Sequence, residues 1–456
     1  MLENLFKLKE NGTNVKTEMM AGLTTFMTMA YILAVNPTIL SASGMDAGAI
    51  FTATAVSACI GTLLMAALAN YPFALAPGMG LNAFFAYTVV GQMGYSWQVA
   101  LAAVFVEGIL FFILSLTKVR EAIFNCIPFS LKYGVTGGIG LFIAFIGLQN
   151  SHIVVDGATL VSIYPFKASL ANGEFYSTGI SALLALIGVI ITAVMMIKNV
   201  RGAILWGIIS TWVLGMLCEV TGLYVPDPSK GAFSVMPDFS NGLYILSLMP
   251  SFMQMDFSAI LTFNFITIML SFMFVDLFDT LGTLIGVASK ANMLDEQGRL
   301  PRIRGALLAD SIATSAGAVL GTSTVTTFVE SSSGVMAGGR TGLTAVTVAG
   351  LFLLSLLFAP IFLAIPAFAT APALIIVGFL MLGTVLNIDF NDLGEAIPAF
   401  IAIIAMPFMY SISEGISLGI ISYVIINVFS GMAGKKNISS IMYILAALFI
   451  LKYIFV

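Results

Sequence analysis

Residues 73–87, FALAPGMGLNAFFAY, form an interrupted apolar segment: Pro77 and Gly78 break it before a short helix can begin. A second stretch, LGTSTVTTFVESSSGVMA at residues 320–337, has the same form, since Gly321 and a run of Thr and Val precede another short helix. Irregular backbone at membrane depth survives only where it is buried in protein or lines a cavity. Interrupted helices at matching positions of two halves therefore indicate a binding site near the middle of a membrane transporter.

The rest of the chain is strongly apolar. Of its 456 residues, 59% are hydrophobic and 9% are charged, whereas about a quarter of the residues of a soluble domain are charged. This composition excludes a soluble fold and predicts an all-α integral membrane protein. One crossing needs about 20 apolar residues, so the chain has room for about fourteen crossings and for no large soluble domain. The cysteines show neither disulfide nor metal-ligand spacing, and we expect no cofactor.

Apolar runs bounded by Gly, Pro or charged residues predict the membrane-spanning segments. The first set is expected near residues 18–40, 48–70, 98–117, 134–149, 179–197 and 201–222, and the second near 258–287, 304–320, 342–364, 371–387, 394–411 and 414–433. The shorter runs 80–92 and 328–337 belong to the two interrupted stretches and bring each half to seven segments. An odd number of segments in each half predicts an inverted repeat. Residues 438–455 allow three interpretations: a further crossing, an interfacial helix, or a sign that 394–433 is divided wrongly.

The distribution of Lys and Arg predicts the orientation in the membrane, because positive charge gathers on the cytoplasmic side. With the N-terminus inside, most basic residues fall in cytoplasmic segments: Lys7, Lys9, Lys16, Lys118, Arg120, Lys132, Lys198, Arg201, Lys290, Arg299, Arg302, Arg304, Arg340, Lys435 and Lys436. Lys167 and Lys230 fall outside. We therefore expect a multi-pass protein of the plasma membrane (cell inner membrane), with a cytoplasmic N-terminus and an external loop at 150–178 that holds His152.

Nearly all charged residues in the predicted spans are acidic: Glu107, Asp276, Asp279, Asp310, Glu330 and Glu414. A carboxylate in hydrocarbon is costly, and no Lys or Arg is expected at similar depth to offset that cost. Each carboxyl group must then be protonated, paired with a cation or bound to a polar ligand, and each of these options is a transport function. For Glu107, a protonated carboxyl bonded to a facing helix is the alternative.

Asp276 and Asp279 lie in FVDLFDTLGTLIG, where helical spacing places them on one polar stripe with Thr280 and Thr283. We expect this stripe to face a cavity. The alternative is a polar helix face that packs against other polar groups in the bundle.

Glu330 opens the second short helix, beside the hydroxyl of Ser331. Thr327-x-x-Glu330 is also a capping box, in which the Glu only returns a hydrogen bond to the backbone of the cap residue. Asn82 occupies the matching short helix of the first half, either as a ligand contact or as a helix-packing amide.

Four segments resemble the signatures of the Azg-like branch of the nucleobase and cation symporter family: TTFMTMAYILAVNP (24–37), LAPGMGLNAFFAYTVV (75–90), FVDLFDTLGTLIGVA (274–288) and GTSTVTTFVESSSGVMAGGRTG (321–342). The resemblance runs nearly end to end. It implies fourteen segments in two inverted repeats of seven, with a core domain (1–120 and 258–365) and a gate domain (121–257 and 366–456). It also implies that short antiparallel strands lead into two half-helices, and that adenine, guanine or hypoxanthine binds between core and gate.

Carried over by position, the polar residues of this family match Asn36, Asp276 and Asp279, Asp310, and Glu330 here. We therefore predict substrate contacts from Asp276, Glu330, Asn36, Asn82 and Ser331, and proton coupling through Asp279 and Asp310. Asp310 has the alternative of a structural link to the loop at Arg304. The uracil and xanthine branches carry a Glu followed four residues later by His or Asp. Here the first acid is Asp276 and Thr280 follows, so no proton role is carried over from a histidine.

The sequence thus predicts a secondary active transporter that imports a purine nucleobase by cation symport through alternating access, with H⁺ as the coupling ion and Na⁺ as the alternative. It leaves open an anion transporter of the sulfate type, a pyrimidine or xanthine permease, and a passive channel. A carboxylate at Glu330 repels an anion, but it accepts paired hydrogen bonds from guanine N1–H and the guanine amino group. No catalytic motif indicates an enzyme. The expected partners are the base and the lipid bilayer, with no nucleic acid, and a homodimer is one possible assembly.

Overall fold

The computed structural model describes residues 2–117, 126–157, 160–227, 232–239, 245–290, 293, 300–432, 434, 436 and 438–455. Within these residues, eleven helices are long and apolar enough to cross a membrane, and shorter helices lie between them. The outer surface carries large apolar side chains such as Ile190, Leu217 and Phe379, which are 63%, 56% and 65% exposed. Water-soluble proteins rarely expose an extensive apolar surface, and here lipid covers it. The prediction of an all-helical membrane protein is confirmed.

The helices of the first half follow the predicted spans closely. They are α1 (Leu2–Phe6), α2 (Val15–Met29), α3 (Ile32–Leu40), α4 (Ala47–Ala69), α5 (Met79–Ala83), α6 (Trp97–Leu116), α8 (Phe129–Asn150), α10 (Gly179–Ile197) and α11 (Ala203–Val220). A π-helix, Phe84–Gln92, continues α5. The first predicted span is two helices, with a break at Ala30 and Tyr31. The predicted 150–178 loop contains a hairpin and a short helix: β2 (Val154–Gly157), β3 (Leu160–Ile163) and α9 (Phe166–Asn172).

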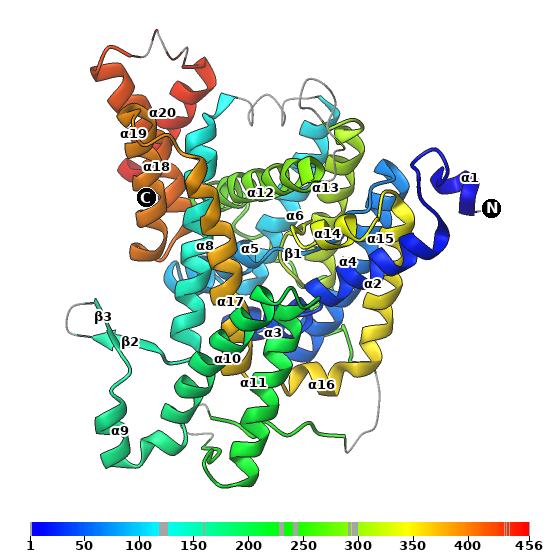
Figure 1. The fold of residues 1–456 in the computed structure, drawn as a ribbon. Coiled ribbons are helices and arrows are strands. Elements are labelled where there is room, and N and C mark those ends of the chain that lie inside the picture. Colours follow the sequence, from blue (N-terminus) through cyan, green and yellow to red (C-terminus); the bar gives the residue numbers. More distant parts are fainter. Residues whose placement is uncertain are drawn as a thin grey trace.

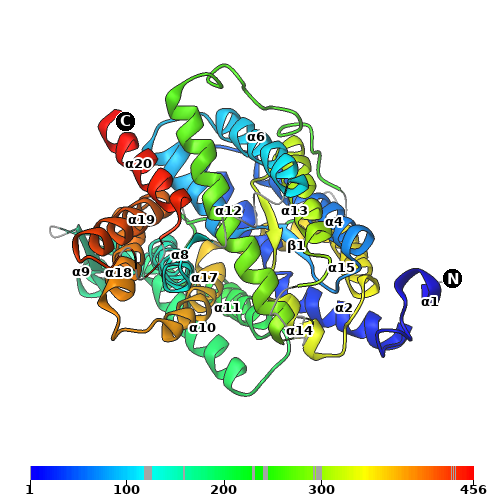
Figure 2. The ribbon, with the colours of Figure 1, turned by 90° about the horizontal axis from the view of Figure 1, so that it is seen from above.

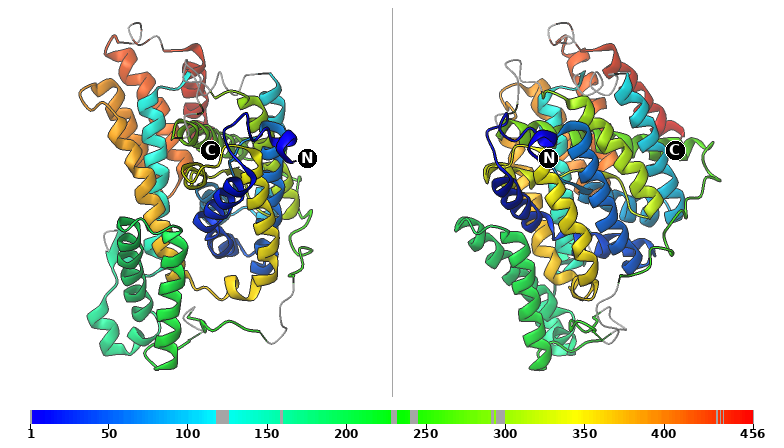
Figure 3. Two further views of the ribbon diagram at one scale, coloured as in Figure 1. Left: turned by 45° about the vertical axis from the view of Figure 1, so that its right-hand side comes forward. Right: turned by 90° about the vertical axis from the view of Figure 1, so that its right-hand side faces the viewer.

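The second half repeats this pattern in the opposite direction. Its helices are α12 (Phe263–Lys290), α13 (Ile303–Leu320), α14 (Ser331–Met336), α15 (Gly342–Ser355), α16 (Ala359–Leu363), α17 (Ala367–Leu382), α18 (Leu393–Phe408), α19 (Ile412–Phe429) and α20 (Ser440–Phe455). Figures 1 and 3 show α10 and α11 toward one end of the protein and α18 and α19 toward the opposite end, as an inverted repeat requires. Within residues 438–455, Ser440–Phe455 form the 16-residue helix α20, which packs against α19.

The helices pack in two groups. One group contains α2, α3, α4, α6, α13 and α15, and the other contains α8, α10, α11, α17, α18 and α19. Seen from above, the two groups lie side by side and α12 runs between them (Figure 2). The division into a core and a gate domain, with the residue bounds given above, stays a prediction. Of the basic residues used for the orientation, Lys118, Arg120, Lys230, Arg299 and Lys435 lie outside the described residues.

A buried carboxylate fixes α2 within the first group. Glu18 on α2 is fully buried, and it accepts hydrogen bonds from the backbone N–H of Arg340 (2.8 Å) and from the hydroxyl of Thr344 (2.6 Å). It therefore caps the N-terminus of α15 with charge of the favourable sign. One turn further along α2, a Cβ added to Gly334 of α14 would lie 2.7 Å from the carbonyl oxygen of Ala21. These contacts hold α2 and α14 at a fixed distance beside the centre of the molecule.

Candidate functional site

Two short strands bring the interrupted stretches of the two halves together at the centre of the protein. β1 (Leu75–Pro77) pairs antiparallel with β4 (Val325–Thr327). The pairing extends by one further bond, because the backbone N–H of Gly78 donates to the carbonyl of Thr324 at 3.0 Å. The half-helix α5 follows β1, and the half-helix α14 follows β4 after three residues. The prediction that a strand leads into each half-helix is confirmed, and we call this meeting point the strand crossing.

Side chains from four helices bond the hydroxyl groups of residues 322–326 at the strand crossing. The pairs are Asn36 of α3 with Thr322 (3.0 Å), Asn82 of α5 with Ser323, Glu107 of α6 with Thr324 (3.0 Å), and Asp279 of α12 with Thr326 (3.1 Å). A buried hydroxyl that loses its partner costs about 1–3 kcal/mol. The run of Ser and Thr is therefore explained by its neighbours, since each hydroxyl ties a different helix to the crossing.

Glu330 lies between β4 and α14, and its carboxylate turns toward α3. The hydroxyl of Tyr31 donates a hydrogen bond of 2.6 Å to Glu330 Oε1, and Tyr31 is fully buried at the break between α2 and α3. Glu330 makes no side-chain cap to α14. Within the described part of the chain, Thr327 Oγ1 has no hydrogen-bond partner. The capping-box interpretation of Glu330 is therefore wrong, and its carboxylate is available for another role.

Asp276 and Asp279 have different neighbours although they are one helical turn apart. Asp279 Oδ2 accepts the bond from Thr326 of β4 and so lies at the strand crossing. Asp276 lies against α13 instead, where the hydroxyl of Thr280 is 2.8 Å from Asp276 Oδ1 and 2.8 Å from Asp310 Oδ1. The single stripe predicted for α12 therefore divides, and Asp279, which we assigned to proton coupling, is the aspartate that reaches the strand crossing.

The remaining predicted substrate residues are bonded within the protein. Besides Thr322, Asn36 donates to the hydroxyl of Thr54 at 2.7 Å, and Asn82 accepts from Ser323 as described. Ser331 Oγ accepts a hydrogen bond of 3.0 Å from the backbone N–H of Ala74, just before β1. Asn36, Asn82 and Ser331 are all fully buried. Their contacts position the two strands, and a direct contact of these residues with substrate stays a prediction.

Two residues that bond to predicted carboxylates were not identified from the sequence. Tyr31 stands within TTFMTMAYILAVNP, but nothing local marks its hydroxyl as the partner of a residue 299 positions away. Lys452 of α20 is buried, and its Nζ lies 2.5 Å from Glu414 Oε1 of α19. The expectation that Glu414 has no basic partner is therefore wrong. A lone lysine in an otherwise apolar helix was the available signal, because such a charge needs a partner when buried.

The strand crossing presents carboxylates to the space around it. Glu330 is held by Tyr31, and Asp279 is held by Thr326 of β4. Two carboxylates held in this way accept N–H donors of a polar ligand and repel an anion. Among the described residues, no group of three or more His, Cys, Asp or Glu side chains could hold a metal ion.

Comparison with known proteins places the chain among permeases. The profile of the Permease family (Xan_ur_permease) matches residues 16–418. The guanine/hypoxanthine permease PbuO of Bacillus subtilis is 45% identical over 98% of this chain and 99% of its own length. The adenine permease AdeQ of Escherichia coli is 43% identical over 100% of this chain and 96% of its own length. The transmembrane domain of a cyanobacterial bicarbonate transporter, BicA, shares the fold, with a TM-score of 0.65 and 16% identity over 89% of this chain and 97% of that chain. The chain therefore belongs to the Permease family and is a membrane permease, not an enzyme.

Proposed function

We propose that this permease carries a purine nucleobase, with guanine, hypoxanthine and adenine as the candidate substrates. The observation that carries the proposal is the pair of carboxylates at the strand crossing, Glu330 held by Tyr31 and Asp279 held by Thr326. The names of PbuO and AdeQ support the same substrate class, since both are purine permeases and both match this chain along nearly its whole length.

The chemistry of a purine suits a fixed carboxylate. Guanine presents N1–H beside its amino group, and these two parallel donors match the two oxygens of one carboxylate. Tyr31 uses one hydrogen-bonding position on Oε1 of Glu330, and an ionised carboxylate has about four such positions on its two oxygens. Asp279, which bonds Thr326 of β4, supplies further acceptors at the crossing. A ligand edge with several N–H groups can therefore be satisfied in this place without a positive side chain.

A sulfate-type anion substrate is the alternative that the shared fold raises. BicA has this fold and is named as a bicarbonate transporter, but at 16% identity the likeness extends to the fold alone. An anion at the crossing would meet Glu330 and Asp279, and like charges in a poorly solvated place repel strongly. The carboxylates therefore favour a neutral base with N–H donors over an anion.

Uptake by cells that lack their own nucleobase permeases tests the substrate class. Radiolabelled guanine, hypoxanthine, adenine, xanthine and uracil are offered separately to cells that express the chain. We expect saturable uptake of at least one of the three purines named above. Uptake of uracil alone, or of none of the five bases, would reject the proposal, and uptake of xanthine alone would reject the three candidate purines.

We also propose that transport is cation symport with H⁺, Na⁺ being the alternative, and that the two aspartates of α12 have the reverse of the roles predicted from sequence. Asp279 lies at the crossing and is assigned to the base. Asp276 joins Asp310, which keeps its predicted part in coupling. The hydroxyl of Thr280 has one hydrogen for two carboxylate contacts of 2.8 Å, so the second contact is favourable when one carboxyl carries a proton.

The orientation that we propose has the N-terminus in the cytoplasm and the 150–178 loop outside, from the distribution of Lys and Arg. A cysteine placed at His152, which is exposed, should react with an impermeant thiol reagent in intact cells. Reaction only after lysis would reverse the orientation.

A further inference from the structure

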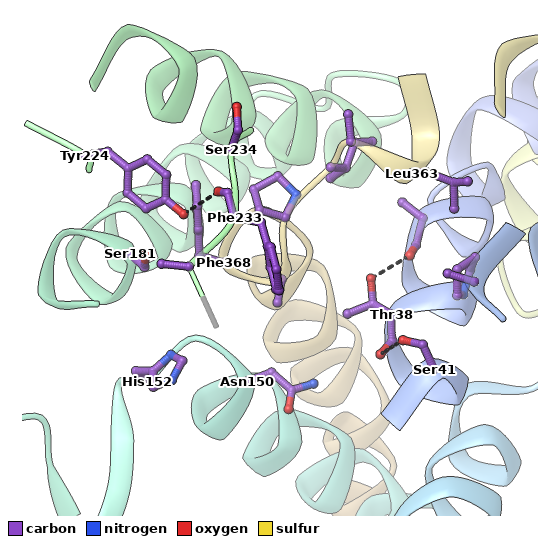
Figure 4. A pocket seen from close by; sticks show the side chains of 18 of the residues that line it. Thr38, Ser41, Asn150, His152, Ser181, Tyr224, Phe233, Ser234, Leu363 and Phe368 are labelled. Atoms are coloured by element: carbon purple, nitrogen blue, oxygen red, sulfur yellow. Dashed lines mark hydrogen bonds between the residues drawn. The ribbon is translucent and has the colours of Figure 1, made fainter. Parts of the chain in front are cut away.

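A cavity of about 440 Å³ lies between the two helix groups, at the end of the protein that carries the 150–178 loop. Figure 4 shows Thr38 of α3 and Ser41, just after α3, on one side of it, and Tyr224 and Ser181 on the other, with His152 nearby. Its volume falls within the range of roughly 300–1,000 Å³ that is usual for small-molecule sites. Because its walls come from both groups, relative movement of the groups opens or closes it.

One face of α3 connects this cavity to the strand crossing. Three residues of α3 and the Ser41 that follows it line the cavity, at the spacing i, i+3, i+4 and i+7 of a single helix face: Ala34, Pro37, Thr38 and Ser41. Tyr31, whose hydroxyl bonds Glu330, precedes Ala34 by one turn on the same face. At 1.5 Å per residue, Ala34 lies about 4.5 Å farther along the helix than Tyr31. The cavity therefore begins one helical turn from Tyr31, the residue whose hydroxyl bonds the carboxylate that we assign to the base.

An exposed aromatic ring is held in the wall of the cavity. Phe233 is 64% exposed, and its carbonyl accepts a hydrogen bond of 2.7 Å from the hydroxyl of Tyr224. The next two residues are fastened to Glu219, which accepts from the hydroxyl of Ser234 (2.6 Å) and from the backbone N–H of Val235 (2.8 Å). The backbone under Phe233 is thus fixed on both sides. An aromatic ring that is exposed on a fixed backbone offers a flat surface for stacking.

The lining is uncharged. Among the described residues that line the cavity, none is Lys, Arg, Asp or Glu. His152 has a left-handed backbone (φ +58°), and within the described residues its ring makes no hydrogen bond. Partial desolvation lowers the pKa of His152 below its usual value of 6.5, so the neutral ring, with one donor and one acceptor, prevails at pH 7. Neutral polar groups beside aromatic rings suit a flat, uncharged heterocycle.

We propose that this cavity is a second binding site for the nucleobase, which the base occupies before it reaches Glu330. The ring of Phe233 stacks on the base, and His152 bonds to its polar edge. The inference rests on the proposed function, because it takes the transported base as the occupant. Wild-type uptake of the five bases tests that function separately. If the wild type carries none of them, both proposals fall.

Removing the Phe233 ring tests the stacking. Phe233→Ala keeps the backbone carbonyl that Tyr224 bonds, so the fold is retained. We expect the concentration for half-maximal uptake to rise about tenfold, as the loss of one base-stacking ring predicts, while the maximal rate changes less than twofold. The matched control is Phe239→Ala, since Phe239 is 50% exposed in the same segment and does not line the cavity. An unchanged value for Phe233→Ala, or an equal rise in both variants, overturns the proposal.

Protection from labelling tests whether the cavity binds base by itself. Ser41→Cys is made in a chain that also carries Cys126→Ser and Cys218→Ser, and it is labelled with a thiol reagent with and without hypoxanthine or adenine. We expect base to slow the labelling at least threefold, and to do so equally when Glu330→Gln is added. Leu160→Cys, at a residue 64% exposed in β3, should show no protection. Protection that disappears with Glu330→Gln would mean that the base binds at the strand crossing alone, and the second site would be refuted.

Discussion

The half-helices α5 and α14 occupy matching places in the two repeats, but the chemistry around them differs. Along α5 and the π-helix that continues it, the side chains make neutral contacts: Asn82 accepts from Ser323, the ring centroids of Phe84 and Phe272 are 4.9 Å apart, and Tyr87 accepts from the amide of Asn150 in α8 (3.0 Å). The carboxylate of Asp279 lies only beside Gly78, at the start of α5. Around α14 the central group is the carboxylate of Glu330, held by Tyr31. The half-helix α5 therefore provides packing and contact with the second helix group, whereas α14 begins at a carboxylate.

The difference shows how an inverted repeat can bind a ligand that has no matching symmetry. The two halves need the same backbone path, because each must satisfy its irregular strand at the centre of the membrane, and they do so by pairing β1 with β4. Side chains are free to diverge once that pairing is made. Substitutions near α14 should then change base binding, whereas substitutions near α5 should change stability.

The largest effect is expected for Glu330→Gln. The variant replaces a carboxylate oxygen by an amide donor, and a buried donor left facing N–H groups costs about 2–3 kcal/mol. We expect the affinity for labelled hypoxanthine or guanine to fall about 100-fold, measured by equilibrium binding to purified protein. The elution profile in size-exclusion chromatography and the temperature of thermal unfolding should be the same as in the wild type. Unchanged affinity in a folded variant would remove Glu330 from the site.

The second largest effect is the difference that we expect between Asp279→Asn and Asp276→Asn in base binding and accumulation. If Asp279 faces the base, its variant loses binding by a factor approaching 100. Asp276→Asn should keep binding and exchange of base across proteoliposomes, but lose accumulation driven by an imposed pH gradient. The opposite pattern, with exchange retained and accumulation lost in Asp279→Asn, would restore the roles predicted from sequence. Accumulation that follows a Na⁺ gradient instead would make the coupling ion Na⁺.

Tyr31→Phe should have an intermediate effect. The change removes one hydroxyl and with it the bond of 2.6 Å to Glu330. A hydrogen bond to a charged group contributes about 1.5–3 kcal/mol, and part of this is regained if water replaces the hydroxyl. We expect base affinity to fall about tenfold with the preference among purines unchanged, by competition binding. A fall as large as that of Glu330→Gln would indicate that Tyr31 contacts the base directly.

Asn82→Ala should have the smallest effect on binding. It leaves the hydroxyl of Ser323 without its partner, which lowers stability by about 1–3 kcal/mol, while base affinity changes less than about threefold. Thermal unfolding in detergent and equilibrium binding measure the two quantities on the same sample. If affinity falls as far as in Glu330→Gln, the first half-helix contacts the base, as we predict from sequence. The contrast between the two half-helices then disappears.

Much of the fold follows from sequence, because the features that define it are local. The predicted span 179–197 coincides with α10, and 48–70 differs from α4 by one residue at each end, since apolar length and helix-ending residues are properties of a single segment. The two interrupted stretches were located for the same reason, because Pro77, Gly78 and Gly321 are local signals of a break in a helix. The break between α2 and α3 was missed, because Ala30 and Tyr31 carry no such signal.

The arrangement of the site depends on tertiary contacts between distant segments. Asp276 and Asp279 are three residues apart on α12, so their side chains point about 60° apart, and only the positions of β4 and α13 determine which one meets the strand crossing. Tyr31 and Glu330, like Lys452 and Glu414, are partners that no spacing connects. The sequence alone establishes that these carboxyl groups lie in the membrane and need partners. Which partner each one has depends on how distant helices pack, and that is set by the fit of whole helix surfaces, which no single segment contains.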